Sequence, residues 1–291
     1  MTEHSYRETK RHGDARFPFN LYPCTIPQDF PQVGLHWQDS MELVFVKQGT
    51  GRVQAGVTLY EARARDIFIF VPGTLHALYS VPGSEMQYEN IIFSMEVLGG
   101  PEDLCAESIL LPLQSGRLPL PVLLRPGHDH YDEAAACLYA AESASRRRAP
   151  GFELAIRGAL SVFLSLLMQD QTGTLATDTA DTRRLKKVLA LLEQDPAAAV
   201  SVAEAAACCG LSPSHFMRWF KKMTGKSFIA FVNERRLCAA AERLRRSDDT
   251  ILKIAGDCGF DNLSYFNRQF KRRYGITPKG YRAGKSDPRR G

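Results

Sequence analysis

Hydrophobic and polar residues follow one pattern in the first hundred residues of this 291-residue chain and another in the rest. Between residues 17 and 98, short apolar runs rich in β-branched and aromatic side chains are separated by turn sequences such as QGTG (48–51), PGT (72–74) and PGS (82–84). Closely spaced runs of this kind predict a small antiparallel barrel or sandwich. The expected strands are VGLHW, MELVFV, RVQAG, VTLYE, DIFIFV and YENIIFSM.

The pattern changes to a helical period after residue 130. Apolar residues recur every three or four positions from 130 to 169, which predicts two antiparallel helices broken at APG (149–151). The Pro- and Leu-rich stretch 99–127 is expected to be irregular, and the small, polar stretch 172–182 is expected to be a linker. Everything after residue 183 is predicted to be helical, with breaks at Pro and Gly, until the region of Pro278.

The helical part contains an internal repeat. GLSPSHFMRWFKKMTG (210–225) returns as GFDNLSYFNRQFKRRYG (259–275), with two Phe residues four positions apart, a pair of cations and a closing glycine in both copies. The offset between the copies is 49 at the first glycine and 50 at the later positions. A repeat of this detail indicates a duplicated structural unit.

Each copy has the signals of a helix-turn-helix motif. A short helix precedes the first glycine, which suits a left-handed turn, and Ser212 in one copy and Asp261 or Asn262 in the other are expected to cap the second helix. The two Phe side chains then face the core, and the cations face outward. A helix presented in this way fits the major groove of DNA.

The distribution of charge agrees with this interpretation. The whole chain has a formal charge of +5, but residues 183–291 carry 23 Lys and Arg against 10 Asp and Glu, whereas residues 1–182 carry 14 against 22. An acidic front and a basic back indicate two domains with different partners. The basic part favours a polyanion, and nucleic acid is the first candidate.

These motifs carry a family resemblance. Residues 183–283 resemble the DNA-binding domain of AraC/XylS-family transcription regulators, on SVAEAAACCGLSPSHFMRWFKKMTGKSF, RRLCAAAERL and ILKIAGDCGFDNLSYFNRQFKRRYGITPKGYR. The resemblance implies that two recognition helices, held apart by the helix expected in 226–249, bind direct-repeat half-sites of double-stranded DNA in successive major grooves. The residues expected to contact DNA are Ser214, Met217, Arg218 and Lys221 in the first copy and Leu263, Ser264, Asn267, Arg268 and Lys271 in the second. Met217 and Leu263 are apolar where relatives often carry amides, and an apolar side chain can contact a thymine methyl group.

The front half has a shorter resemblance, over about residues 30–95. HWQDSMELVFVKQGTGRV followed by RDIFIFVPGTLH resembles the cupin-type ligand-binding barrel that precedes many such regulators. His36, Glu42 and His76 stand where metal-binding cupins place ligands, but Gln38 replaces a second His, and an amide is a poor ligand for a transition metal. We therefore expect no metal and no cofactor. His36, Gln38, Glu42 and His76 are instead expected to line the barrel mouth and to bind a small polar effector, a sugar or another polar metabolite, or else to be hydrogen-bonded rim residues without a ligand.

The expected fold class is multidomain, with an N-terminal all-β cupin-like barrel, a helical segment and a C-terminal all-α double helix-turn-helix domain. The expected boundaries are a flexible arm at 1–16, the effector domain at 17–125, a helical and possible dimerisation segment at 126–170, a flexible linker at 171–182, the DNA-binding domain at 183–284, and a tail at 285–291. Within the DNA-binding domain the two helix-turn-helix motifs are expected at about 202–223 and 251–273.

Three functions were weighed. The first is a bacterial transcription regulator, an activator or a repressor, that acts as a homodimer and has RNA polymerase as a further candidate partner. LSVFLSLLM (160–168) is apolar enough for a dimer interface, although packing on its own barrel explains it equally well. The second is a metal-dependent cupin enzyme fused to a DNA-binding tether. The third is a DNA-repair alkyl acceptor, which needs an activated Cys, whereas Cys24 has no cationic neighbour in sequence.

We expect no enzymatic activity, because Gln38 stands where a metal-binding cupin has a second His, and the remaining composition favours a cytoplasmic protein. The seven Cys are odd in number and show no C-x-x-C spacing, which fits neither a disulfide framework nor a thiolate zinc site. The longest apolar stretch, 158–168, is shorter than the ~20 residues that a membrane-spanning helix needs. No apolar signal-peptide core follows the first residues, so we expect no membrane partner.

Overall fold

The computed structural model describes residues 6–8, 12–100, 104–115, 118–169, 180–194 and 200–284. The chain forms two compact units: Arg7–Thr182, and the residues from Arg183 onward together with Tyr6. The expected tail at 285–291, and residues 171–179 of the expected linker, lie outside the described residues. Residues 180–182 belong to a helix and not to a linker.

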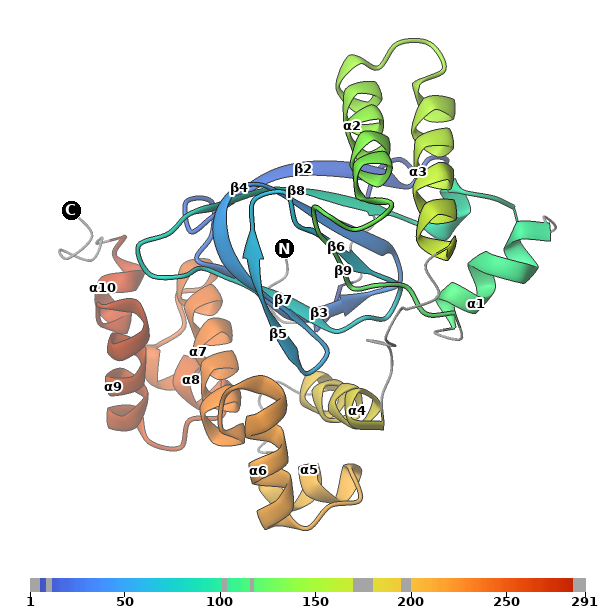
Figure 1. The fold of residues 1–291 in the computed structure, drawn as a ribbon. Coiled ribbons are helices and arrows are strands. Elements are labelled where there is room, and N and C mark those ends of the chain that lie inside the picture. Colours follow the sequence, from blue (N-terminus) through green and yellow to red (C-terminus); the bar gives the residue numbers. More distant parts are fainter. Residues whose placement is uncertain are drawn as a thin grey trace. The chain divides into compact units, whose positions relative to one another are not determined.

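The first unit is a strand-rich barrel with a helical pair (Figure 1). Strand β4 pairs with β6 and β8 in one sheet and with β5 and β7 in the other, so it runs through both sheets. Strand β2 extends the first sheet beyond β8, and β3 extends the second beyond β7. The strands are β1 (Arg7–Glu8), β2 (Phe19–Ile26), β3 (Gln32–Gln38), β4 (Met41–Ala55), β5 (Thr58–Arg63), β6 (Ile67–Phe70), β7 (His76–Tyr79), β8 (Met86–Phe93) and β9 (Leu123–Leu124).

The first six residues of β4, Met41–Val46, are buried on both faces, which explains their largely apolar run. Val44 and Val46 face the core inside the barrel, whereas Leu43 and Phe45 face the core under the helices. The alternation follows the two-residue period of a strand. The four consecutive residues from Leu43 to Val46 therefore contribute to two separate cores, and both cores fix the register of β4.

Helices α2 (Tyr131–Arg147) and α3 (Phe152–Gln169) lie side by side and cover the outer face of this sheet (Figure 1). The prediction of two helices broken at 149–151 is confirmed. Among the described residues, α3 is the helix that is long and apolar enough to cross a membrane by length and composition. Its inward stripe packs in the core shared with the sheet, at Ile156, Leu160, Phe163, Leu164 and Leu167.

Three local expectations for this unit were wrong. QGTG (48–51) does not end a strand: β4 continues through it, with a bulge between Val46 and Gln48. The segment 1–16 is not wholly a flexible arm, because β1 pairs with β3 and His12 is buried. Part of 99–127 is helical, with a π-helical turn at Ala106–Leu110 followed by α1 (Leu111–Gln114). Strands β2 and β7 were missed.

The second unit is helical in its described residues. Helices α5 and α6 form the first copy of the repeat, α8 and α9 form the second, and α7 packs against helices of both (Figure 1). The helices are α4 (Ala180–Gln194), which begins before the division between the units, α5 (Val202–Cys208), α6 (Pro213–Thr224), α7 (Phe228–Arg246), α8 (Ile251–Asp257), α9 (Leu263–Tyr274) and α10 (Pro278–Arg282).

Candidate functional site

The two copies of the repeat make the same turn. The amide of Gly210 donates to the carbonyl of Ala207, and the amide of Gly259 donates to Gly256, at 3.0 and 2.8 Å. Both glycines have positive φ angles, +66° and +80°, which a residue with a Cβ adopts only at a cost. The backbone therefore turns between the two helices of each copy in the same way.

The helix caps also match between the two copies, including caps outside the two stretches that were compared in the sequence. Ser201 caps α5 through the amide of Glu204, and Thr250 caps α8 through the amide of Lys253, both at 3.1 Å. Ser227 and Thr277 cap α7 and α10 in the same way, because each side chain accepts a hydrogen bond from the backbone amide three residues later. Of the two expected caps for α9, Asn262 is the one observed, with its Oδ1 accepting from the Tyr265 amide at 2.8 Å. Ser212 occupies the cap position of α6 but its side chain makes no capping bond.

Buried aromatic side chains pack α6 and α9, the second helix of each copy, against the neighbouring helices. The spacing of the Phe residues in the sequence predicts this packing. Phe216, Phe220, Phe266 and Phe270 are all fully buried. The Phe216 and Phe220 rings lie 5.5 Å apart, and so do those of Phe266 and Phe270. Each pair fixes the rotation of its helix about its own axis, so the opposite face is presented to solvent.

That opposite face contains the residues expected to contact DNA. Ser214, Arg218 and Lys221 on α6 are exposed, and Met217 is half-buried. On α9, the exposed residues are Ser264, Asn267, Arg268 and Lys271, and Leu263 is half-buried. The structure thus gathers each predicted set on one surface of its own helix. Arg268 also lies over the ring of Tyr265, 5.6 Å from its centroid.

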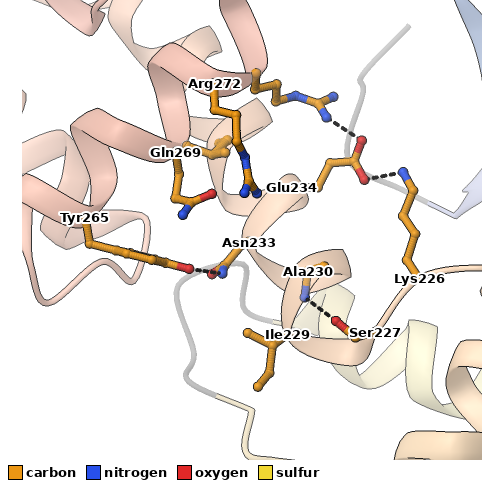
Figure 2. Close-up of a pocket in the computed structure, with 11 residues that line it drawn as sticks. Lys226, Ser227, Ile229, Ala230, Asn233, Glu234, Tyr265, Gln269 and Arg272 are labelled. Carbon is orange, nitrogen blue, oxygen red and sulfur yellow. Dashed lines mark hydrogen bonds and ion pairs between the residues drawn. The ribbon is translucent and has the colours of Figure 1, made fainter.

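Tyr265 lies on α9 between Ser264 and the buried Phe266, and it is only half-buried. Its hydroxyl accepts a hydrogen bond from the Asn233 amide of α7 at 2.8 Å, so it ties α9 to α7 (Figure 2). The two residues line a groove of about 420 Å³, whose other wall includes Lys226. Glu234 forms ion pairs with two cations, Arg273 and Lys226. Figure 2 shows the contact with Lys226, which measures 2.5 Å.

Glu234 joins α7 to α9 through its ion pair with Arg273, and the sequence reasoning missed this contact. Burial by itself would raise the pKa of its carboxyl group, but hydrogen bonds from Lys226 and Arg273 outweigh burial and hold the pKa below its usual value. The carboxylate is therefore charged at neutral pH and joins the start of α7 to the end of α9. No local pattern in the sequence signals a pair separated by 39 residues.

The four residues proposed from the cupin resemblance meet inside the barrel. His36 and His76 are paired across β3 and β7, and their ring centroids lie 4.3 Å apart. Nε2 of His76 lies 2.9 Å from Oε2 of Glu42, and the Gln38 amide donates to the same oxygen at 2.5 Å. Nε2 of His36 lies 4.0 Å from it.

The cluster lies buried inside the barrel and not at an open barrel mouth, where the sequence analysis expected it. Gln38, Glu42 and His76 are buried, with 4%, 1% and 1% of their surface exposed. Two further residues, which the sequence reasoning assigned to a flexible arm, complete the cluster. Oε2 of Glu8 lies 3.6 Å from Nε2 of His36, and Oε1 of Glu8 lies 3.4 Å from Nε2 of His12.

The residues of the cluster shift one another's pKa values. Burial would raise the pKa of Glu42, but the charges and hydrogen bonds of His76 and His36 lower it to about 2. Burial would likewise lower the pKa of His76, but the Glu42 carboxylate outweighs burial and raises it. Burial and the neighbouring His76 lower the pKa of His36. Glu42 is thus held as an anion that attracts a positive charge.

Two family descriptions match the chain. "AraC-like ligand binding domain" matches residues 20–107, and "Helix-turn-helix domain" matches residues 205–284. The first covers most of the barrel, and the second covers both copies of the repeat from α5 to α10.

Curated relatives include regulators matched over part or most of their length. PocR of Salmonella typhimurium is 36% identical over 104 residues, which are 36% of this chain and 34% of that protein. The TetD protein of transposon Tn10 from Escherichia coli is 36% identical over 104 residues, which are 75% of that protein. The transcriptional activator RhaR of Pectobacterium atrosepticum is 27% identical over 87% of both chains. The match thus spans about a third of PocR but most of TetD and RhaR.

A solved structure also aligns along the chain. ToxT from Vibrio cholerae, solved with a bound unsaturated fatty acid, is 15% identical, covers 94% of this chain and 97% of its own, and has a TM-score of 0.42.

Proposed function

This chain belongs to the AraC/XylS family of transcription regulators, and we propose that its two recognition helices, α6 and α9, bind successive major grooves of one DNA site. The observation that carries this proposal is the repeated turn: the same hydrogen bonds at Gly210 and Gly259 present two exposed cationic helix faces from one compact unit. The intervening α7 has 19 residues, which corresponds to a length of about 28 Å. Grooves on one face of DNA recur every ~34 Å.

The exposed side chains divide into base-contacting and phosphate-contacting groups. Arg218 and Arg268 are proposed to contact guanine edges, each worth about 1–3 kcal/mol of discrimination, and Asn267 suits adenine. Met217 and Leu263 are proposed to contact thymine methyl groups. Lys221 and Lys271 are proposed to contact phosphates, with Ser214 and Ser264 near the helix starts completing the contacts.

The barrel is proposed to bind a small polar effector, a sugar or another polar metabolite, through the cluster of His36, Gln38, Glu42 and His76. Support comes from the match to a ligand-binding family and from polar side chains inside an otherwise apolar barrel. An effector regulates DNA binding only if its affinity differs between two states of the protein. We propose regulation in this sense, and no enzymatic reaction.

We further propose that the chain acts as a homodimer in the cytoplasm, bound to DNA, and that it contacts RNA polymerase as an activator. Support for the dimer is the outer face of α3, where Leu154 and Val162 are 71% and 52% exposed although both are apolar. Support for activation is the similarity to the activator RhaR.

The experiment that tests DNA recognition is selection of bound sequences from a random DNA pool by the whole protein, at two salt concentrations. Two short boxes about one helical turn apart, retained at the higher salt, are expected. Enrichment without boxes that disappears at the higher salt means that the basic face contacts phosphates alone, and this result contradicts the proposal.

A further inference from the structure

We propose that Tyr265 is a positioning residue for DNA recognition, because its ring holds the Arg268 guanidinium toward the end of α9 that enters the major groove. The central carbon of this guanidinium lies 5.6 Å from the centroid of the Tyr265 ring. A cation within about 6 Å of a ring centroid is attracted to the electron-rich face of the ring. The inference rests on the proposed contact between Arg268 and a guanine edge, and it names the group that orients Arg268 for that contact.

The geometry of the helix places Arg268 over Tyr265. The two residues are three positions apart on α9, and side chains at this spacing are neighbours on a helix surface. Long side chains on a helix point back toward its N-terminus. Arg268 begins in the second turn of α9, and its guanidinium therefore lies toward the first turn, over the Tyr265 ring. The N-terminal residues of a recognition helix are the ones that contact base edges in helix-turn-helix proteins.

The Tyr265 ring is held in place from several directions. Its hydroxyl accepts a hydrogen bond from the Asn233 side chain of α7 at 2.8 Å, which Figure 2 shows. Its ring packs near the buried Phe260, with 6.4 Å between the two ring centroids. Its backbone amide donates to the cap residue Asn262. Contacts from α7, from the core and from the helix cap fix the orientation of the ring, so a guanidinium that lies over the ring is oriented as well.

The orientation of Arg268 matters because a guanine contact uses two hydrogen bonds at once. The planar guanidinium can donate both bonds only in one geometry, and an exposed Arg side chain loses rotamer freedom when it adopts that geometry. Arg268 is exposed, and no ion pair restrains it among the residues that the structure describes, so the Tyr265 ring is what limits its freedom. A side chain that is ordered before binding loses less entropy when it binds.

The first copy of the repeat has the arginine without the ring. His215 stands where the second copy has Tyr265, and Arg218 stands where it has Arg268. His215 is exposed, and within the described part of the chain no aromatic ring lies beneath Arg218. The protein thus contains two equivalent arginines, one with a ring under its guanidinium and one without, and a change at His215 is a matched control for a change at Tyr265.

The test is competition binding by the full-length protein on its selected DNA site, with the guanine of one box replaced at a time. Discrimination is the ratio of the two dissociation constants. Tyr265→Met keeps an apolar side chain but removes the ring, and it is expected to lower discrimination in the α9 box about two- to fivefold. Tyr265→Phe keeps the ring and loses only the hydroxyl, so it is expected to lose less than Tyr265→Met. His215→Met is expected to leave discrimination in the α6 box unchanged.

A double variant separates positioning from a merely structural role. In the Arg268→Ala protein, Tyr265→Met is expected to cause no further loss of discrimination, because the ring acts through Arg268. A side chain that only stabilises the fold would instead lower the affinity for all DNA sequences by a similar factor and leave the ratio of dissociation constants unchanged.

NMR observes the contact between Arg268 and the ring without DNA. Side-chain protons that lie over the face of an aromatic ring are shifted upfield by the ring current, and the Arg268 signal is assigned by its loss in Arg268→Ala. The upfield shift is expected to persist in Tyr265→Phe and to disappear in Tyr265→Met. The Arg218 side chain is expected to show no such shift.

Different results overturn the positioning role and the base contact. If Arg268→Ala relaxes the guanine preference and Tyr265→Met does not, the positioning role fails and the base contact stands. Unchanged discrimination in Arg268→Ala rejects the base contact, and the positioning role with it. Higher discrimination in Tyr265→Met means that the ring holds Arg268 away from DNA, which contradicts the proposal. If Tyr265→Met does not fold, the NMR spectrum of the unchanged protein decides, because absence of the upfield shift overturns the proposal.

Discussion

The first and second helix-turn-helix motifs have the same backbone turn but different attachments to the helix between them. In the first, Met223 near the end of α6 is buried, with 1% of its surface exposed. The equivalent residue of the second is Arg273, which forms an ion pair with Glu234 of α7. Tyr265 of α9 also bonds to Asn233 of α7, whereas its equivalent, His215, is exposed.

The comparison shows which features a duplicated motif has to keep and which can change. The left-handed glycines, the Phe pair and the caps before α5 and α8 determine the path of the chain, and both copies retain them. Both copies pack their Phe pair on apolar residues of α7, but the second copy adds polar bonds to α7 from Tyr265 and Arg273. Apolar packing is insensitive to pH and salt, whereas an ion pair depends on both.

The largest expected effect is the loss of a shared core residue. Phe220→Ala and Phe270→Ala should each destabilise the DNA-binding unit by about 3–5 kcal/mol, because both side chains are fully buried. Trp219 fluorescence during denaturant unfolding measures this in the full chain, with Trp37→Phe as background. A loss below 1 kcal/mol in either copy would mean that the two cores are not equivalent.

The next effect concerns DNA specificity. Arg218→Ala should relax base preference in one half-site by about 1–3 kcal/mol and leave the other half-site unchanged, and Arg268→Ala should do the reverse. Lys221→Ala is the comparison variant, because loss of a phosphate contact weakens binding to all sequences and lowers the salt dependence. Competition binding with single-box mutant operators gives these values. Unchanged discrimination in Arg218→Ala rejects its assignment as a base contact.

The helix caps differ between the copies and give a smaller effect. Asn262→Ala should cost about 1 kcal/mol, since its side chain caps α9. Ser212→Ala should lower the free energy of unfolding by no more than about 0.3 kcal/mol, because the Ser212 side chain makes no capping bond. The same unfolding measurement applies. Equal losses in the two variants would show that the capping bonds are not a real difference between the motifs.

The smallest effect is a difference in pH dependence. The pKa of Glu234 is lowered in the folded protein, so its contribution to stability is present above the usual value of 4.5 and is lost as the pH falls through the lowered pKa. Acidification from neutral pH to below 4.5 should therefore lower the free energy of unfolding more in the unchanged protein than in the Glu234→Gln variant, because the variant has no carboxylate to protonate at this position. Unfolding curves at several pH values test this, with Glu242→Gln as control because the ion pair of Glu242 with Arg246 stays within α7.

Sequence alone predicted what depends on local periodicity. The 3.6-residue stripe identified the buried Phe pairs and therefore the exposed faces with Arg218 and Arg268. The resemblance to the cupin barrel implied that His36, Glu42 and His76 lie in one site. These features need only residues a few positions apart, or a pattern that the family shares.

Features that depend on distant pairing were not predictable. Strand β1 has two residues and hence no period, so Glu8 appeared to belong to a polar arm. Gly49 has a positive φ angle of +77° and looks like a turn in sequence, but the bulge beside it lets β4 continue. The ion pair between Glu234 and Arg273 joins two helices that no local pattern connects.

The length of α7 has a consequence for how the protein can evolve. One residue inserted in the middle of this helix rotates everything after it by about 100° and moves it by about 1.5 Å along the axis. The second recognition helix would then leave the face of DNA that the first one meets, although neither motif had changed. Under the proposed binding mode, base contacts can therefore diverge freely between the copies, while the number of residues in α7 is fixed by the helical repeat of DNA.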